Sequence, residues 1–169
     1  LSLRHLDQIV SIAPDFQSIQ WRLGGPGSDF TFPNPMDRFY EQHSAIPLPN
    51  GNILLFDNGN DRPGEEGGQY SRPLELQLDL ENMTATAVWQ FRHNPLIFSV
   101  CCSSAERLPN GNTLILYGTV FRPDPRPFKI IEITPDGGVA WEVVHISPGK
   151  QNQYRIYSAD SIMGEQQID

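Results

Sequence analysis

The pentapeptide Leu-Pro-Asn-Gly-Asn occupies residues 48–52 and recurs, unchanged, at residues 108–112. Repetition at a period of this size is typical of folds that are built from one repeated structural unit. Asn-Gly is favoured in two-residue hairpin turns, because both central residues of such a turn take a positive φ. We therefore predict a tight hairpin turn centred on the Asn-Gly pair of each copy.

The segments on either side of both turns are predicted to be β-strands. They lie at residues 44–48 and 53–56 around the first copy, and at residues 105–108 and 113–117 around the second. Long apolar runs in these segments indicate strands that are covered on both faces.

A second hairpin follows the first in each copy, and its returning strand contains a Trp. Its strands are predicted at residues 74–78 and 84–91 in the first copy and at residues 130–133 and 139–143 in the second. Strands at residues 8–12 and 19–23 form half a copy ahead of them, with Trp21 in the same place. Four antiparallel strands per repeat, without a 3.6-residue periodicity, are typical of a β-propeller blade.

We therefore predict an all-β fold that forms part of a β-propeller over residues 1–169. The predicted units are a half blade at 1–23, blades at 43–92 and 101–143, and the start of another blade or a closing segment at 154–169. A blade takes roughly 40–50 residues and a closed ring needs at least about four blades, so we expect the chain to be a fragment. The alternative is a complete open sheet or small sandwich, but open blade edges would expose unpaired backbone.

The composition argues against several classes of partner. The net charge is −8 and no basic run occurs, which disfavours nucleic acid and anionic membrane surfaces. No stretch approaches the roughly 18 apolar residues that a membrane-spanning helix needs. The ten Arg outnumber the two Lys, a bias that suits the recognition of anions in a fixed geometry.

The two cysteines, Cys101 and Cys102, are adjacent. Neighbouring side chains on a strand point to opposite faces, so the pair is a poor start for a metal site. We expect core residues, or partners of cysteines elsewhere in a longer protein, and we expect no metal or cofactor. Asn82 begins an Asn-Met-Thr glycosylation sequon in a predicted turn, which would be usable in a protein secreted from a eukaryotic cell.

The densest set of polar residues lies between residues 41 and 72, and it contains His43, Asn58, Arg62 and Arg72. His43 begins a blade strand, and the ends of the innermost strands line the channel mouth of a propeller. A His with two Arg and an Asn nearby suits an anionic group such as sulfate or phosphate, because the guanidinium groups bind its charge while the imidazole transfers a proton or attacks. The alternative is that His43 only caps a strand and that the segment around Asn58 is only a tight turn.

Motifs in a fixed order along the chain resemble those of the arylsulfotransferase (aryl-sulfate sulfotransferase) family. They are Ser-Leu-Arg-His-Leu-Asp at 2–7, Trp-Arg-Leu-Gly-Gly at 21–25, Ser-Asp-Phe at 28–30, Gln-His at 42–43, Leu-Phe-Asp-Asn-Gly-Asn at 55–60, Tyr-Ser-Arg at 70–72, and later segments at 107–114, 132–137, 141–142 and 154–155. Phe-Asp-Asn-Gly and Tyr-Ser-Arg, in this order after Gln-His, form the most specific part of the series.

The resemblance implies a propeller of about six four-stranded blades, typically exported and therefore secreted or periplasmic. It implies transfer of a sulfuryl group from an aryl sulfate ester to a phenol, without a nucleotide sulfate donor and, in the characterised bacterial members, through a transient sulfohistidine. Carried over by motif, His43 corresponds to an active-site His and Arg62 to a sulfate-binding Arg, with Asn58 beside them and Arg72 as a second candidate. The partners implied are the two small molecules and the remainder of the same propeller.

The chain departs from the family pattern at the expected nucleophile. That His is expected in the blade after Tyr-Ser-Arg, but residues 98–105 contain none; His93 lies in a nearby loop, and His145 suits a surface or packing role. Another active-site His of the family belongs to a blade before residues 2–7. An alternative function is therefore a non-catalytic propeller with a binding or structural role, and a weaker one is a quinoprotein-like propeller, in which a Trp also recurs once per blade.

Overall fold

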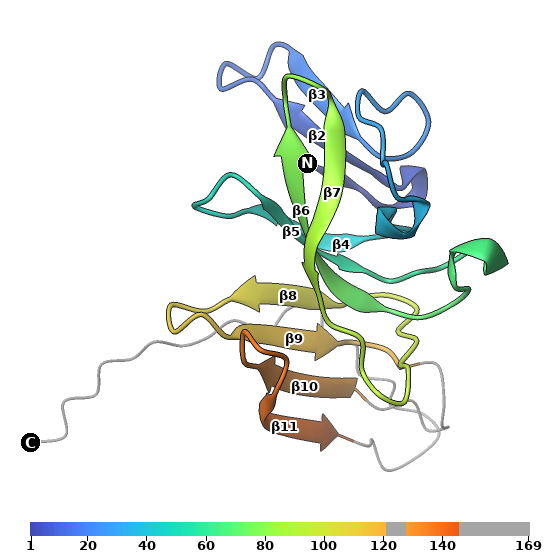
Figure 1. Cartoon of the computed structure of the whole chain (residues 1–169), viewed down its shortest axis with the longest axis vertical. Coiled ribbons are helices and arrows are strands. Elements are labelled where there is room, and N and C mark those ends of the chain that lie inside the picture. Colours follow the sequence, from blue (N-terminus) through green and yellow to red (C-terminus); the bar gives the residue numbers. More distant parts are fainter. Residues whose placement is uncertain (121–127, 146–169) are drawn as a thin grey trace, which may run out of the picture.

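The computed structural model describes residues 1–120 and 128–145, and these fold into three antiparallel β-sheets that follow one another along the chain (Figure 1). The only helical elements in this part of the chain are three single 3₁₀ turns, η1 (Arg4–Leu6), η2 (Pro35–Asp37) and η3 (Gly64–Glu66). The predicted all-β class is confirmed. The segment predicted to begin or close a blade at 154–169 lies outside the described residues.

Each sheet is a meander in which strands that are consecutive in the chain pair with each other. Sheet 1 contains β1 (Ser2–Leu3), β2 (Gln8–Ile12) and β3 (Ile19–Leu23). Sheet 2 contains β4 (His43–Pro47), β5 (Ile53–Asp57), β6 (Arg72–Asp79) and β7 (Thr84–Gln90). Sheet 3 contains β8 (Ser104–Arg107), β9 (Thr113–Tyr117), β10 (Phe128–Ile133) and β11 (Val139–His145).

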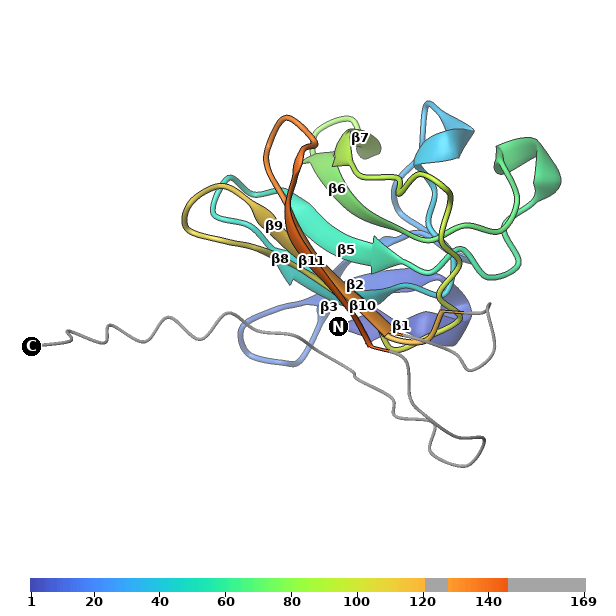
Figure 2. The ribbon, with the colours of Figure 1, turned by 90° about the horizontal axis from the view of Figure 1, so that it is seen from below.

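Sheet 2 lies between the other two and packs against both (Figure 1), and the three sheets overlap when the molecule is seen from below (Figure 2). Because successive side chains on a strand point to opposite faces, β5 contributes to two cores. Ile53 and Leu55 join a core with sheet 1, and Phe56 joins a core with sheet 3, where its ring meets that of Tyr117 edge-on with the ring centroids 5.4 Å apart. All residues of β5 and β9 are buried, as their apolar runs predicted.

The predicted geometry of the two Asn-Gly turns is wrong. In both copies the Leu N–H donates to the carbonyl of the last Asn (2.8 Å), and the Gly N–H donates to the Leu carbonyl (2.9 Å). Only the glycines have a positive φ, +86° at Gly51 and +87° at Gly111. Each turn is therefore a three-residue loop, a type I turn followed by a left-handed Gly. Pro49 explains the difference, because its fixed φ suits the second position of a type I turn.

The two asparagines of each turn bind a carboxylate on the third strand of the same sheet. Asn50 and Asn52 donate to Glu75 Oε1 on β6 at 3.2 and 2.6 Å. The second copy repeats the arrangement with Glu132 on β10, at 3.4 and 2.6 Å from its own two amides. The repeated pentapeptide therefore fastens the first hairpin of a sheet to its third strand.

The Gly- and Pro-rich segment at residues 24–40 crosses from sheet 1 to sheet 2 and runs beside the edge strand β7. Thr31 forms a parallel bridge with Thr84, and Asp37 accepts a hydrogen bond from the Ala87 N–H at 3.0 Å. Phe30 and Phe39 of this segment enter the core between the two sheets. The segment thus covers the edge of sheet 2 and leads directly into β4.

Candidate functional site

His43 and Asn58 are brought together by the pairing of β4 with β5. His43 is the first residue of β4, lies opposite Phe56 in the register, and is half-buried. Its Nδ1 is 2.6 Å from Asn58 Oδ1, while the Asn58 amide nitrogen donates to the Ser99 carbonyl at 2.7 Å. Because that donation fixes the orientation of the amide, Oδ1 accepts a hydrogen bond from Nδ1–H. The lone pair of the neutral ring is therefore on Nε2.

Burial lowers the pKa of His43 below its ordinary value of 6.5, and the hydrogen bond to Asn58 only partly opposes this effect. Arg4 lowers the pKa further through its charge, whereas Glu41 raises it. The ring is therefore neutral at pH 7. Its Nε2 lies 3.4 Å from the backbone N–H of Cys102, a long contact that leaves the nitrogen basic. Such a nitrogen can act as a general base or a nucleophile.

Arg4 and Glu41 complete the surroundings of His43, and the sequence analysis did not single them out. They form an ion pair with each other, and Arg4 also donates to the Val100 carbonyl at 3.1 Å. His5 lies on the outer side of this pair, with Nδ1 at 3.7 Å from Glu41. The sequence did contain a signal for Arg4, because the Arg-His dipeptide lies inside the first family motif, at residues 2–7.

Asp57, next to Asn58, is bound by two buried guanidinium groups. Arg62 and Arg72 both donate to Asp57 Oδ2, with 1% and 0% of their side chains exposed. The other carboxylate oxygen accepts the Tyr40 N–H at 3.0 Å. Arg72 also donates to Gln90 Oε1 at 2.7 Å and to two backbone carbonyls of the segment before β4 at 2.8 Å. This arrangement fixes the backbone from which Asn58 projects.

The guanidinium of Arg62 lies over the ring of Tyr70, 3.9 Å from its centroid. Burial lowers the pKa of Arg62, and the charge of Asp57 opposes that effect. Direct binding of sulfate by Arg62 or Arg72 stays a prediction. In the structure both guanidinium groups are buried, and both bind Asp57, the residue that precedes Asn58. The positively charged side chain that acts on His43 is Arg4.

The loop before β8 closes the other side of the site. Ser71 Oγ donates to the Asn58 carbonyl at 2.6 Å and accepts the Ser99 N–H at 2.8 Å, so the loop and the Asn58 segment are joined. The prediction that the two cysteines point to opposite faces is wrong, because they lie in a bend rather than a strand. Cys102 has a φ of +61°, and the Sγ atoms of Cys101 and Cys102 are 2.7 Å apart.

The remaining predicted residues lie away from His43. His93 Nδ1 is 2.8 Å from the Pro95 carbonyl. His145 ends β11 with its ring stacked on that of Phe128, the centroids 4.8 Å apart. Asn82 is exposed in the turn between β6 and β7, so its glycosylation stays a prediction.

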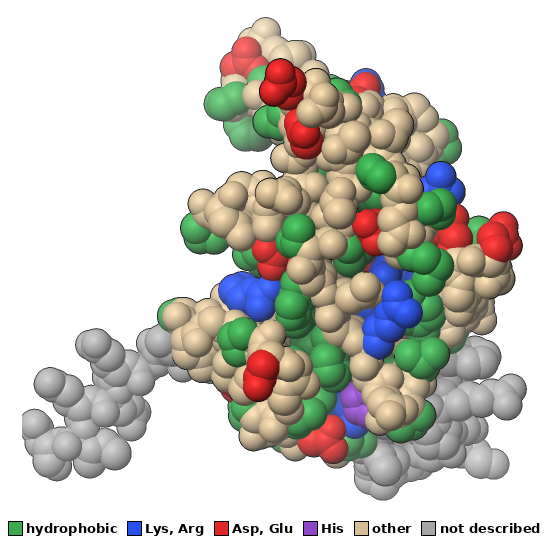
Figure 3. All heavy atoms as spheres, in the orientation of Figure 1, with side chains coloured by type: hydrophobic (Ala, Val, Ile, Leu, Met, Phe, Trp, Pro, Cys, Tyr) green, Lys and Arg blue, Asp and Glu red, His purple; other side chains and the backbone are tan. Residues whose placement is uncertain are grey.

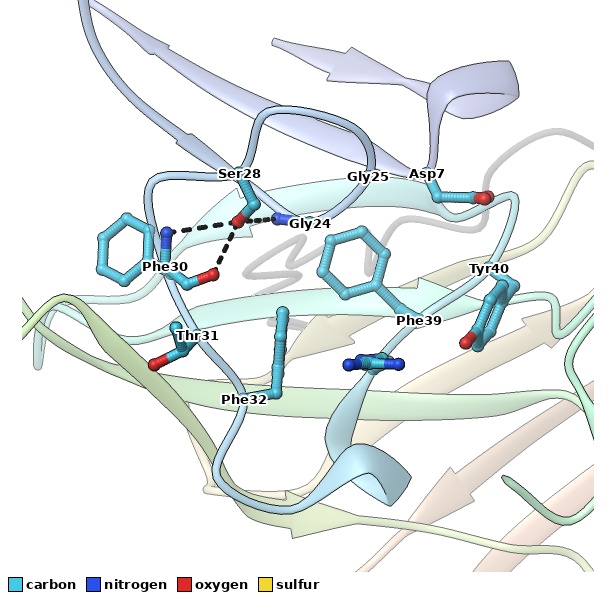
Figure 4. Close-up of a pocket in the computed structure, with 10 residues that line it drawn as sticks. Asp7, Gly24, Gly25, Ser28, Phe30, Thr31, Phe32, Phe39 and Tyr40 are labelled. Atoms are coloured by element: carbon cyan, nitrogen blue, oxygen red, sulfur yellow. Dashed lines mark hydrogen bonds between the residues drawn. The ribbon is translucent and has the colours of Figure 1, made fainter. Parts of the chain in front are cut away.

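A cavity of about 390 Å³ is lined by the segment at residues 24–40 and by Asp7, which lies between η1 and β2 (Figure 4). Its lining includes three phenylalanines, Tyr40 and Arg38, together with the polar residues Ser28 and Asp7; the phenylalanines are Phe30, Phe32 and Phe39. Asp7 also accepts the Glu41 N–H at 2.6 Å. This hydrogen bond links the lining of the cavity to the backbone that precedes His43.

The described residues contain neither a metal cluster nor a membrane-spanning helix. No group of three His, Cys, Asp or Glu side chains within 1–120 and 128–145 is placed to hold a metal ion. The same part of the chain contains no helix of the length and apolarity needed to cross a membrane. On the face drawn in Figure 3, acidic and basic side chains are interspersed rather than gathered into one basic patch.

Comparison with models of known protein families places the chain in a family. The family model described as Arylsulfotransferase (ASST) matches residues 1–157. A search of the curated proteins finds no match.

Proposed function

The chain belongs to the arylsulfotransferase family, and from this premise we propose that it transfers a sulfuryl group from an aryl sulfate ester to a phenolic acceptor at the site around His43. No nucleotide sulfate donor takes part. The observation that supports this proposal is the His43–Asn58 hydrogen bond of 2.6 Å, which places the lone pair of a neutral imidazole on Nε2. We further propose that the protein acts outside the cytoplasm, secreted or periplasmic, with the remainder of its propeller around it.

In the proposed reaction His43 Nε2 attacks the sulfur of the aryl ester. The bond between sulfur and the aryl oxygen breaks, the aryl oxygen leaves as a phenolate that takes a proton from solvent, and the sulfuryl group stays on Nε2. The acceptor phenol then loses its proton to solvent and its oxygen attacks the sulfur, which restores the lone pair of Nε2. Positive charge on the ring strengthens the bond from Nδ1–H to Asn58, so that bond is stronger in the transition state than in the resting enzyme.

The charged neighbours have separate parts in this proposal. Arg4 supplies positive charge beside His43, where the anionic oxygens of the sulfuryl group would lie. Arg62 and Arg72 act as positioning residues, because both hold Asp57 and through it the adjoining Asn58. Arg4 is therefore the residue that contacts sulfate in this proposal, whereas Arg62 and Arg72 act through Asp57.

The test is turnover of an aryl sulfate donor with a phenol acceptor by the complete protein. We expect His43→Ala to lower kcat/KM by a factor on the order of 10⁶, as the loss of a covalent nucleophile does in other enzymes, because the variant has no group to carry the sulfuryl group. His93→Ala is the matched control, since His93 is held by a loop carbonyl and lies outside the site. Unchanged turnover in His43→Ala would contradict the role of His43.

A non-catalytic scaffold is the second candidate. It is supported by the hydrogen bonds with which Asn58 and Ser71 join the loop around Ser99, because these bonds suffice to explain buried polar groups in this region. In that case the wild-type protein would not turn over any aryl sulfate, and His43→Ala would change neither binding nor stability beyond the loss of one hydrogen bond.

A further inference from the structure

The loop between β7 and β8 places two thiol groups together beside His43. Cys101 and Cys102 are consecutive, and their Sγ atoms lie 2.7 Å apart. Cys101 is half-buried, so a small reagent can reach it, whereas Cys102 is 4% exposed. The hydroxyls of Ser99 and Ser103 both bond to the Cys101 carbonyl, at 3.4 and 3.3 Å, and keep the bend in place. The bend therefore directs the two sulfurs toward each other.

We propose that Cys101 and Cys102 are an oxidation site at which a disulfide bond forms between neighbouring residues. The oxidant is a small disulfide such as oxidised glutathione. The Cys101 thiolate attacks one sulfur of the oxidant and releases one glutathione thiolate. The Cys102 thiolate then attacks Cys101 Sγ, closes the ring and releases the second glutathione. Two protons pass from the cysteines to the two glutathione thiolates, so the exchange is balanced.

The bond between these two residues is reversible. Consecutive Cα atoms are about 3.8 Å apart across a trans peptide, whereas disulfides usually join Cα atoms roughly 4.4–6.8 Å apart. A disulfide between neighbours is therefore strained, and strained disulfides are reduced more easily than structural ones. The pair responds to the thiol and disulfide concentrations around it rather than acting as a permanent cross-link.

Closing the ring changes the surroundings of His43. The peptide that joins the two cysteines carries the Cys102 N–H, and this N–H lies 3.4 Å from His43 Nε2. A ring that contains this peptide twists it, so the N–H moves relative to the imidazole. Oxidation of the two cysteines thereby changes the surroundings of His43 Nε2, the nitrogen that would carry the sulfuryl group. The consequence for turnover rests on the proposed function, whereas the change at Nε2 does not.

The first experiment detects the bond. The protein is incubated with oxidised glutathione, or with dithiothreitol, then treated with iodoacetamide, digested without reduction and analysed by mass spectrometry. In the oxidised sample we expect the peptide with both cysteines to carry no alkyl group and to be two hydrogens lighter; dithiothreitol restores two alkylation sites. Cys101→Ser, the matched control, keeps one alkylation site or one glutathione adduct. Two alkylated cysteines in the oxidised wild type would overturn the proposal.

The second experiment separates this proposal from the function. The Nε2 resonance of His43 is compared by ¹⁵N NMR in oxidised and reduced protein labelled at histidine, with His93 as the internal reference. We expect the His43 signal to move in the wild type and to stay in Cys101→Ser. A stationary signal in protein that mass spectrometry shows to be oxidised would overturn the link to His43. A moving signal in a protein without sulfotransfer activity would uphold the link and contradict the catalytic role.

Discussion

At His43 the position of one proton depends on a residue fifteen positions further along the chain. Asn58 Oδ1 accepts a hydrogen bond from His43 Nδ1–H, because the Asn58 amide nitrogen donates to the Ser99 carbonyl, a group from yet another segment. The sequence supplied both His43 and Asn58 as candidates. It did not supply the bond between them, since the bond exists only once β4 pairs with β5 and the loop before β8 folds over both.

The proposed role of His43 predicts a pH dependence of sulfotransfer. In the proposed reaction the neutral ring is the active form, so kcat/KM should rise with pH through the lowered pKa of His43 and level off above it. Asn58→Asp places a negative charge beside Nδ1, which favours the imidazolium and moves the acidic limb to higher pH. The pH profile of kcat/KM measures this shift. Gln17→Glu, which adds the same charge in an exposed turn, should leave the limb in place.

Asp57 stabilises this region because it pairs with two buried guanidinium groups. Asp57→Asn removes the counter-ion of two guanidinium groups whose side chains are at most 1% exposed. Breaking a buried ion pair on one side costs about 3–5 kcal/mol, because an uncompensated charge stays buried. Urea denaturation of the two proteins should show this loss. The exposed neighbour provides the comparison, and we expect Asp61→Asn to unfold at nearly the wild-type urea concentration.

Among the elements, the repeated turn explains both the success and the error of the sequence analysis. The Asn-Gly pair correctly indicated a hairpin, and the strands appear within one or two residues of the predicted positions. The turn type was wrong because Asn-Gly was considered without the Pro before it. The function of the two asparagines was also missed, since their partner is a glutamate more than twenty residues further along the chain.

Glu75 and Glu132 occupy the same place in the two repeats and offer a matched comparison. Glu75 also accepts Arg107 from sheet 3 at 2.7 Å, whereas Glu132 bonds within its own sheet. We expect Glu75→Gln to lower the free energy of unfolding by about 1–3 kcal/mol, the usual loss for hydrogen bonds to a charged group, and Glu132→Gln to lower it less. Thermal denaturation of the two variants tests the order. Equal losses would contradict a link between sheets 2 and 3 at this position.

Glu75 also makes the free energy of unfolding depend on pH. Burial would raise the pKa of Glu75, but the hydrogen bonds from Asn52 and Asn50 and the charge of Arg107 outweigh it and hold the pKa below its usual value of 4.5. Because the folded pKa is the lower one, this contribution is present above pH 4.5 and disappears as the pH falls through the folded pKa. Glu75→Gln should therefore be closer in stability to the wild type at pH 3 than at pH 7, as urea denaturation at both values can show.

The segment at residues 24–40 has a role that depends on the cavity it encloses. Its aromatic walls suit an aryl ring, and we propose that one ring of the donor or acceptor binds there. Phe32→Ala should raise KM several-fold with a smaller change in kcat, since the ring is bound in both the ground state and the transition state. The exposed Phe16→Ala is the control. A fall in kcat at constant KM would contradict binding of the ring in this cavity.

In the molecule as a whole, stability comes from stacking the three sheets rather than from any one of them. Phe56→Ala should lower the free energy of unfolding by about 3–5 kcal/mol, because it leaves a hole between sheets 2 and 3. Phe16→Ala removes the same ring where 84% of the residue is exposed, and it should have almost no effect on the urea midpoint. Comparable losses in the two variants would show that the sheets do not stabilise each other through this core.

The order of the sheets could be predicted from local signals in the sequence. The apolar run of β5 indicates a strand that is covered on both faces, and the repeat gives the number of strands in each sheet. The surroundings of His43 could not be predicted in the same way. Arg4, Glu41 and Cys102 come from three separate segments that only the packing of sheets 1, 2 and 3 brings together. Local patterns give the elements of this fold, and contacts between distant segments give its chemistry.

The carboxylate shared by Arg62 and Arg72 has an electrostatic consequence. Two guanidinium groups meet one carboxylate, so this interior trio holds one positive charge in excess, in a chain whose net charge is −8. Water screens the acidic exterior, but it hardly screens a charge that is enclosed by protein. The trio therefore contributes a positive potential behind Asn58, opposite in sign to the contribution of the acidic surface residues. This contribution would attract an anionic ester that approaches His43, although the ester does not contact the trio.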